Sequence, residues 1–123
     1  MLEVCGTRDT FIKERTIASG GSGYAAKADA TAGKRPVENE DVIQFLAHFQ
    51  KGAIGTLGTS RIGSERKIGL GYEIQGTKGT LLFTQERLNE LQFYRNNDPA
   101  RERGFKTIYA GPEHPHYGAF LGQ

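Results

Sequence analysis

Residues 37–61 read VENEDVIQFLAHFQKGAIGTLGTSR, and this stretch decides the fold. Between residues 42 and 49, apolar side chains recur at every second position: Ile43, Phe45, Ala47 and Phe49. A period of two predicts a β-strand, because successive side chains of a strand point to opposite faces. The other side of this strand also carries Val42 and Leu46, so we expect a sheet that is contacted on both faces.

Glycine-bearing turns divide the chain that follows into further strands. Lys51-Gly52 predicts a hairpin, because glycine supplies the positive φ of a tight turn, and Gly76–Gly79 predicts another. Glycines within the expected strands, such as Gly55, indicate the close approach of another group. Strands are expected at Ala53–Arg61, Lys67–Gln75, Thr80–Thr84, Gln92–Tyr94 and Phe105–Tyr109.

The remaining segments add little helix to this sheet. Gln85–Leu91 alone has a helical tendency, and it is too short to be stable by itself. Residues 2–5 and 10–12 predict one long bent strand or two short ones. Ala18–Pro36 is rich in Gly, Ala and Ser, which predicts a flexible loop at about 18–36. The predicted fold class is therefore α+β, mostly β, with an open antiparallel sheet.

Length and composition limit the choice of fold and partner. The 123 residues fit a single domain, residues 1–123. The hydrophobic fraction of 37% is low, so we expect a thin core and a sheet face that needs a cover from elsewhere. The net charge of +2 is scattered, which argues against nucleic acid as a partner. No run approaches the ~20 apolar residues of a membrane helix, so no membrane association is expected.

The side chains that could carry chemistry do not form a complete catalytic site. Cys5 is the only cysteine, which predicts a buried, inert thiol and a reducing, cytoplasmic setting. Adjacent strand positions point to opposite faces, so the acidic cluster of Glu38, Glu40 and Asp41 is interpreted as a solvated strand start and not as an acid–base pair. His114 and His116 lack a third ligand, so no metal site is predicted.

A dinucleotide site is also not predicted within these residues. Gly20–Gly23 is the longest glycine-rich run, and no helical period follows it. No G-x-G-x-x-G motif follows a strand and opens a helix, so the sequence predicts no cofactor-binding residues in this chain. We therefore predict no catalytic, cofactor-binding or metal-binding residues within it.

Several motifs, in order, closely resemble the C-terminal domain of the Gfo/Idh/MocA oxidoreductases. They are Glu-Asn-Glu-Asp at 38–41, Ser-Arg at 60–61, Glu-Ile-x-Gly-Thr-Lys-Gly at 73–79, and Glu-Arg-x-Asn-Glu-Leu at 86–91. GFKTIYAGPEHPHY at 104–117 and GTRDTFIKER at 6–15 extend the likeness. The resemblance runs from about Leu2 to Tyr117, which is nearly the whole chain.

The resemblance implies a two-domain parent protein. Its N-terminal Rossmann domain would bind NAD or NADP, and its C-terminal sheet would form a homo-oligomer through one face. The reaction would move a hydride between the cofactor and a sugar, a polyol or a related alcohol or ketone. The family's Rossmann domain and its catalytic lysine and histidine are missing from these residues, so the chain alone is expected to be inactive.

The resemblance also suggests two groups of substrate-binding residues. The turn after the Ser-Arg strand, with Arg66, Lys67 and Ile68, often approaches the substrate in this family. Arginine and lysine would supply hydrogen-bond donors to a hydroxylated substrate. The segment with His114, His116 and Tyr117 is the second candidate.

Two other functions remain open from the sequence. The chain could be a stand-alone, non-catalytic β-sheet module for dimerisation or binding. A nucleic-acid binder would need a basic face together with stacking aromatic residues, which the scattered charge does not favour.

Overall fold

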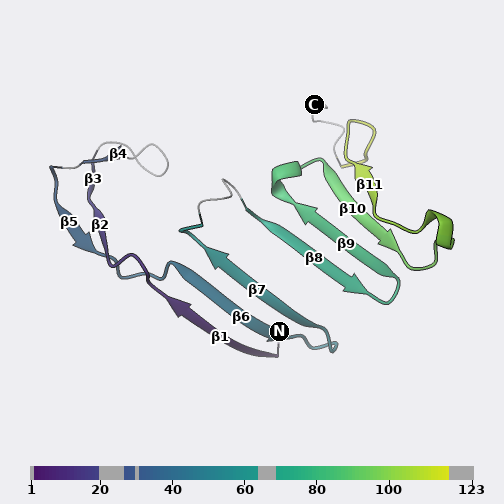
Figure 1. The fold of residues 1–123 in the computed structure, drawn as a ribbon, viewed down its shortest axis with the longest axis horizontal. Coiled ribbons are helices and arrows are strands. Elements are labelled where there is room, and N and C mark those ends of the chain that lie inside the picture. The colour runs from purple at the N-terminus through teal and green to yellow at the C-terminus, as the bar shows by residue number, and fades with distance from the viewer. Residues whose placement is uncertain (1, 20–26, 30, 64–68, 117–123) are drawn as a thin grey trace. The chain divides into compact units, whose positions relative to one another are not determined.

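The computed structural model describes residues 2–19, 27–29, 31–63 and 69–116. These residues fold mainly into antiparallel strands, which confirms the predicted fold class. Helix is limited there to two 3₁₀ turns, η2 (Gln85–Arg87) and η3 (Ala100–Glu102). Figure 1 shows the strands in chain order: β1 (Glu3–Asp9), β2 (Glu14–Thr16), β3 (Ala18–Ser19), β4 (Lys27–Ala28), β5 (Lys34–Pro36), β6 (Val42–His48), β7 (Ile54–Ser60), β8 (Gly71–Gly76), β9 (Gly79–Thr84), β10 (Glu90–Arg95) and β11 (Lys106–Tyr109).

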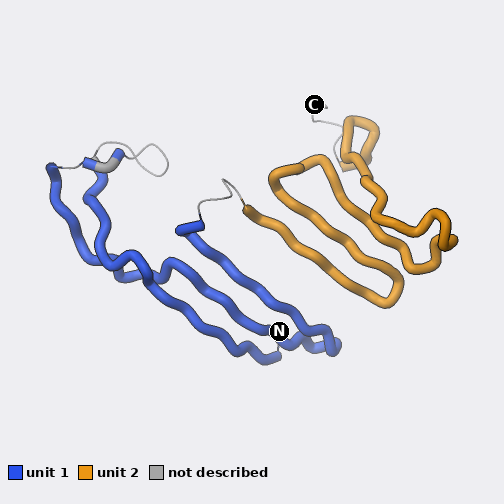
Figure 2. Tube along the Cα trace, viewed as in Figure 1, with its two compact units in different colours: residues 1–64 blue, residues 65–123 orange. Residues whose placement is uncertain are grey.

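The chain divides into two compact units, residues 1–64 and residues 65–123 (Figure 2). The first unit contains a three-stranded sheet in the order β1-β6-β7 and two small ladders, β2-β5 and β3-β4. The second contains a four-stranded sheet in the order β11-β10-β9-β8. A single domain over residues 1–123 stays a prediction.

The central strand of the first unit is β6, as its alternating pattern predicts. One face of β6 holds Ile43, Phe45 and Ala47, and Ala47 is only 3% exposed. The opposite face carries Leu46, which is 60% exposed. Phe45 lies in register with Gly6 of β1 and Leu57 of β7, so the strand is paired along both edges. The period-two prediction is therefore confirmed, with one face better covered than the other.

Glycines allow the tight approaches in this sheet. Gly52 adopts φ 85° in the β6–β7 turn, as predicted, and its N–H donates to the carbonyl of Phe49 at 2.9 Å. A Cβ at Gly6 would lie 2.5 Å from the Cβ of Phe45, so a side chain cannot be accommodated there. A Cβ at Gly55 would lie 3.4 Å from the Phe49 ring, which packs over this position. The prediction that strand glycines mark close approach is confirmed at Gly55.

The structure differs from the sequence prediction at the amino-terminal end. β1 continues through Thr7-Arg8-Asp9, which lie between the two predicted strand segments, 2–5 and 10–12. The predicted loop at 18–36 contains strand at both ends: β3 pairs with β4, and β5 pairs with β2. Residues 20–26, within this loop, lie outside the described residues. The ladders form because an antiparallel hairpin satisfies the backbone groups even where side chains contribute little apolar surface.

Cys5 is exposed, so the prediction of a buried thiol was wrong. Cys5 lies opposite Leu46 on the less covered face of the sheet. β1 is also one of the two outer strands among the three that the structure pairs in this sheet. The β-strand pattern around Cys5 predicted its secondary structure and could not show which face would be covered.

The second unit has one apolar face and one polar face. On the apolar face, Tyr72 of β8 is paired with Phe83 of β9, and their rings stack at a centroid distance of 5.1 Å. On the polar face, Gln92 donates from its side-chain amide to Thr107 Oγ1 at 2.9 Å across β10 and β11. η2 occupies the start of the segment with the helical tendency, Gln85–Leu91.

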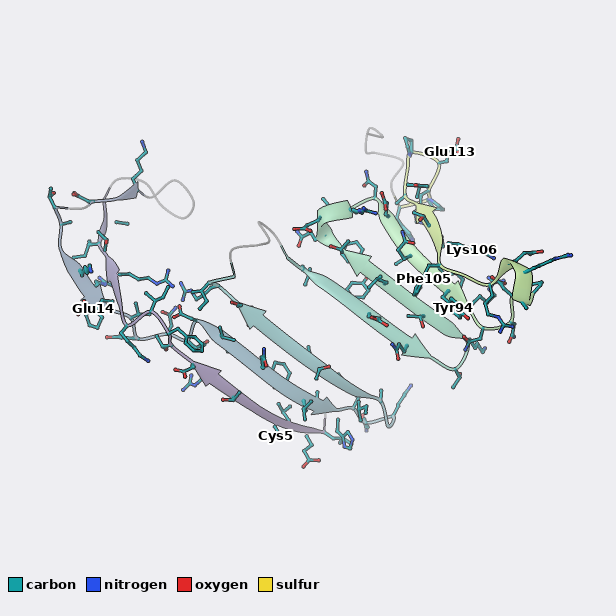
Figure 3. All side chains as sticks on the ribbon, in the orientation of Figure 1. Cys5, Glu14, Tyr94, Phe105, Lys106 and Glu113 are labelled. Carbon is teal, nitrogen blue, oxygen red and sulfur yellow. The ribbon has the colours of Figure 1, made fainter. Side chains whose placement is uncertain are left out.

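Asp98 holds the connection between β10 and β11. Its carboxylate accepts a hydrogen bond from Lys106, which lowers the pKa of Asp98, and its backbone carbonyl accepts two from the guanidinium of Arg103. Next to this connection, the rings of Tyr94 and Phe105 lie 5.7 Å apart (Figure 3). The long turn between the two strands is thus fixed by charge and by ring packing.

In the described part of the chain, no helix is both long and apolar enough to cross a membrane.

Replacing Gly79 with alanine should destabilise the second unit. Gly79 lies opposite Arg95 in the β9–β10 pair, and a Cβ there would collide with the backbone carbonyl of Tyr94. Overpacking of this kind costs about 1–3 kcal/mol in the free energy of unfolding. Urea unfolding of Gly79→Ala should show this loss. In Gly104→Ala the new Cβ meets nothing within 4 Å, so that variant is the control. Equal stability of both variants would contradict the close approach.

Candidate functional site

Asp41 is the one buried polar or charged residue among those that the structure describes. Asp41 is 2% exposed and directly precedes β6. Its Oδ2 accepts a hydrogen bond from the backbone N–H of Ile12 at 2.8 Å. Its Oδ1 accepts one from Nη2 of Arg15, also at 2.8 Å. A buried carboxylate needs such donors, because burial without them is strongly unfavourable.

The backbone of Asp41 is bonded as well. Its N–H donates to the carbonyl of Asp9 at 2.8 Å, and its own carbonyl accepts from the N–H of Arg61 at 2.9 Å. Asp41 therefore connects the end of β1, the segment that leads into β2, and the residue that follows β7. We call Asp41 and its partners Ile12 and Arg15 the Asp41 node.

The pKa of Asp41 is lowered from its ordinary value. The hydrogen bond from the backbone of Ile12 is the largest cause, and the hydrogen bond and charge of Arg15 act in the same direction. Burial opposes them, because it disfavours the charged form. The carboxylate is therefore charged at neutral pH, and its charge stabilises the folded state.

This finding corrects the interpretation of the acidic residues as a solvated strand start. The interpretation was wrong at Asp41, which is buried, whereas Glu38 is exposed as expected. The partner of Asp41 is Arg15, which lies 26 residues away in sequence. Local periodicity could not detect this pair, because the two positions meet only when the β2–β5 ladder forms. The only sequence signal was an arginine in the strand before the loop.

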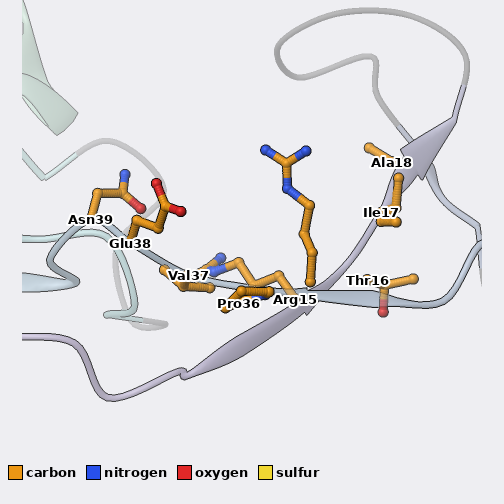
Figure 4. Close-up of a pocket in the computed structure, with 9 residues that line it drawn as sticks. Arg15, Thr16, Ile17, Ala18, Pro36, Val37, Glu38 and Asn39 are labelled. Atoms are coloured by element: carbon orange, nitrogen blue, oxygen red, sulfur yellow. The ribbon is translucent and has the colours of Figure 1, made fainter.

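Next to the Asp41 node lies an open cavity of about 840 Å³, which we call the β2–β5 cavity (Figure 4). Cavities of roughly 300–1,000 Å³ bind small molecules in other proteins. Its lining comes from β2, β5 and the residues that follow each strand: Arg15, Thr16, Ile17, Ala18, Arg35, Pro36, Val37, Glu38 and Asn39.

Two arginines face each other across the ladder beside this cavity. Arg15 and Arg35 are register partners of β2 and β5, so their side chains leave the same face. Arg15 is paired with Asp41, whereas the side chain of Arg35 has no hydrogen bond or ion pair within the described part of the chain. The Nε of Arg15 is buried and has no partner among those residues. Like charges directly opposite are unfavourable, and the Asp41 carboxylate compensates one of them.

The segment that leads to the first predicted substrate group starts at this node. β7 ends at Ser60, in register with Val42, and Arg61 bonds to Asp41. The hydroxyl of Ser60 then accepts hydrogen bonds from the N–H groups of Ile62 and Gly63 at 3.3 and 3.2 Å. The predicted residues themselves, Arg66, Lys67 and Ile68, lie outside the described residues.

The second predicted group belongs to the second unit. The rings of His114 and His116 lie 5.8 Å apart, and the N–H of His116 donates to Nδ1 of His114 at 3.4 Å. Tyr117 lies outside the described residues. No group of three or more His, Cys, Asp or Glu side chains that could hold a metal is found where the structure describes the chain.

Comparison with known proteins identifies several relatives. The sequence profile of the GFO/IDH/MocA C-terminal domain matches residues 2–82. The levoglucosan dehydrogenase of Pseudarthrobacter phenanthrenivorans is 38% identical over 113 residues, which cover 91% of this chain and 29% of that enzyme.

Two solved structures resemble the fold over almost the whole chain. A crystal structure of an NAD binding oxidoreductase from Klebsiella pneumoniae has a TM-score of 0.79 and 39% identity, and the match covers 97% of this chain and 30% of that chain. Levoglucosan dehydrogenase in complex with NADH and L-sorbose has a TM-score of 0.82 and 31% identity, with coverages of 98% and 29%. The chain thus spans about 30% of the length of the relatives it matches.

Removing the charge of Asp41 should destabilise the first unit. Asp41→Asn loses the ion pair with Arg15 and leaves that guanidinium without its partner. We expect the melting temperature at pH 7 to fall by about 5 °C or more, as measured by calorimetry. Glu14→Gln is the matched control, because Glu14 is exposed and its side chain makes no hydrogen bond or ion pair within the described part of the chain. A melting temperature unchanged by Asp41→Asn would contradict the node.

The same variant tests the pH dependence. The folded-state pKa of Asp41 is depressed, so its contribution is fully present above the unfolded pKa of about 3.9. It is lost as the pH falls through the folded pKa, below that value. The difference in melting temperature between the two proteins should therefore be constant from pH 7 to about 5 and should shrink below pH ~4. A difference that grows on acidification would contradict the assignment.

Proposed function

This chain belongs to the Gfo/Idh/MocA family by its C-terminal domain, and from that premise we propose that it is the substrate-side and oligomerisation domain of an NAD(P)-dependent oxidoreductase. The reaction proposed for the whole protein is hydride transfer between the cofactor and a sugar, a polyol or a related alcohol or ketone. The observation that supports this proposal is the match to the family's C-terminal domain. The chain covers about 30% of the length of its relatives, which include levoglucosan dehydrogenase in complex with NADH and L-sorbose.

The cofactor is assigned to the rest of the parent protein. The relatives in complex with NADH support NAD as its identity. Dinucleotide binding of this kind uses a glycine turn at a helix N-terminus, where backbone N–H groups contact the pyrophosphate. Neither such a turn before a helix nor a catalytic lysine–histidine pair is expected in this chain, so the chain alone is proposed to be inactive.

Arg66, Lys67 and Ile68 are proposed to contact the substrate. The proposal is supported by the hydrogen bonds of the residues before them: Arg61 bonds to Asp41, and the N–H groups of Ile62 and Gly63 donate to the hydroxyl of Ser60. A guanidinium and an ammonium group would donate to substrate hydroxyl groups and set their orientation. His114, His116 and Tyr117 are the second proposed group.

The oligomer is proposed to form through the exposed face of the β1-β6-β7 sheet. Cys5, Leu46 and Ile54 lie on this face, and Leu46 and Ile54 are 60% and 75% exposed. Hollows of about 430 and 610 Å³ run along it, each bordered by Cys5 and Leu46. Two copies related by a two-fold axis would bury the same apolar surface on both partners. The exposed free thiol is compatible with the proposed cytoplasmic setting.

The substrate proposal is tested in the parent protein that carries this chain. Arg66→Ala and Lys67→Ala should each raise the KM for the sugar substrate by about tenfold, because a charged hydrogen-bond donor is lost. The affinity for NAD, measured by calorimetric titration, should stay unchanged.

The chain by itself provides the control for the cofactor. Titration with NAD and NADP up to millimolar concentration should show no saturable binding. Saturable binding would contradict the assignment of the cofactor to the rest of the protein, and a lower NAD affinity in the Arg66 or Lys67 variants would contradict their role at the substrate.

The oligomer proposal is tested by sedimentation of the chain. Leu46→Glu should lower the association constant by at least about tenfold, because a charge would be buried at the apolar centre of the interface. Gln75→Glu, an exposed change on β8, is the control and should leave association unchanged. A folded wild-type chain that stays monomeric at all accessible concentrations would contradict the proposal. If the chain associates and its gene encodes no Rossmann domain upstream of Met1, the stand-alone module is favoured.

A further inference from the structure

We propose that the β2–β5 cavity is a recognition site for a neutral, sugar-sized polyol, with Arg35 as its main donor and Glu38 and Asn39 as its acceptors. The inference that this cavity is part of the substrate site rests on the proposed function. The inference that it binds a polyol rests only on the residues that line the cavity. The residues that line the cavity are different from those of the two substrate-binding groups that the sequence predicted.

The donors come from the cross-strand pair of arginines. Arg15 commits Nη2 to Asp41, which fixes its guanidinium at the cavity wall. Arg35 lies directly opposite on β5, and its five N–H donors have no partner among the described residues. A guanidinium is only weakly hydrated and has a rigid set of donors, so it suits two neighbouring hydroxyl groups on a sugar ring.

The acceptors lie on the segment that follows β5, and hydrogen bonds hold this segment at both ends. The N–H of Val37 donates to the carbonyl of Lys13 at 2.9 Å, and the carbonyl of Asn39 accepts from the hydroxyl of Thr10 at 3.1 Å. Glu38 lies between them with an exposed carboxylate, which accepts hydrogen bonds only. The carboxamide of Asn39 can accept and donate. Hydrogen bonds within the protein therefore hold the backbone of the residues that supply the acceptors.

The balance of charge favours a neutral ligand over an anion. Asp41 compensates Arg15, and the Glu38 carboxylate lines the same cavity as Arg35. An anion that approached Arg35 would also meet the negative charge of Glu38. A polyol presents donors and acceptors on the same carbon framework, so it can use the guanidinium and the carboxylate together.

The cavity lies at the end of the sheet where the proposed substrate segment begins. Arg61, the first residue after β7, bonds to Asp41, and Asp41 bonds to Arg15 in the cavity wall. Within the first unit, a ligand in the cavity and the chain after β7 therefore share one structural support. The donors and acceptors that line the cavity would select among sugars by their hydroxyl pattern.

The proposal is tested by nuclear magnetic resonance titration of the 123-residue chain with D-glucose. We expect saturable shifts of the backbone amide signals of Thr16, Ile17, Val37 and Glu38. Arg35→Gln should weaken the apparent affinity about tenfold, because the charged donor is lost. Arg101→Gln removes the same charge at an exposed position on η3 and should leave the affinity unchanged. Absence of saturable shifts, or equal loss in both variants, would overturn the proposal.

Glu38→Gln separates a polyol site from an anion site. For a polyol, the variant should bind D-glucose several-fold more weakly, since the ionised acceptor is lost. The wild-type chain should bind D-gluconate no more tightly than D-glucose. If D-gluconate or inorganic phosphate binds tighter than glucose and Glu38→Gln improves that binding, the cavity is an anion site and the proposal is wrong.

Failure of the site and failure of the proposed function give different results. If the parent protein oxidises a sugar and Arg35→Gln changes neither its KM nor its preference among sugars, the cavity is not part of the substrate site, and the proposed function stands. If the parent is inactive on sugars and polyols, the proposed function fails. The glucose titration of this chain still decides whether the cavity binds a polyol.

Discussion

The buried carboxylate of Asp41 is the constraint on which the first unit depends. A charged group with 2% exposure is stable only if its oxygens are satisfied, and here Ile12 and Arg15 satisfy both of them. Ile12 lies between β1 and β2, and Arg15 lies in β2, so the carboxylate fixes the path by which the chain leaves the sheet. The node thus sets the position of the β2–β5 ladder at the sheet end and the start of the segment after β7.

The sequence predicted the features that arise from local pattern. The period of two at Ile43, Phe45 and Ala47 indicated β6 and its better covered face, and Gly52 indicated the turn by its need for positive φ. The features it missed depend on residues far apart in the chain. Arg15 and Asp41 carry no periodic signal, and the ladder that brings them together is built from strands of three residues. Such short strands have no detectable period, so the node and the cavity required the structure.

Each unit is stabilised by sheet pairing more than by a core. Ala47 is the only buried hydrophobic residue among those the structure describes, and no large side chain there is fully buried. Single-layer sheets usually need a second layer, because one face of each strand otherwise exposes apolar surface. The exposed Leu46, Ile54, Tyr72 and Ile74 are the surface that such a layer would cover. This agrees with a chain that spans about 30% of the length of its relatives, in which further segments are present.

The two arginines paired across β2 and β5 repel each other, and the observed contacts neutralise the charge of only one of them. Two like charges in register destabilise a ladder, and Asp41 neutralises Arg15 alone. If Arg35 served only the fold, a neutral residue at that position would form the same backbone pair without the repulsion. Arg35 opposes local stability, and it lines an open cavity together with Glu38. A ligand in the cavity explains this residue better than a role in folding does. The structural role of Arg15 and the binding role proposed for Arg35 then follow from one feature: Asp41 holds one guanidinium and leaves the other available.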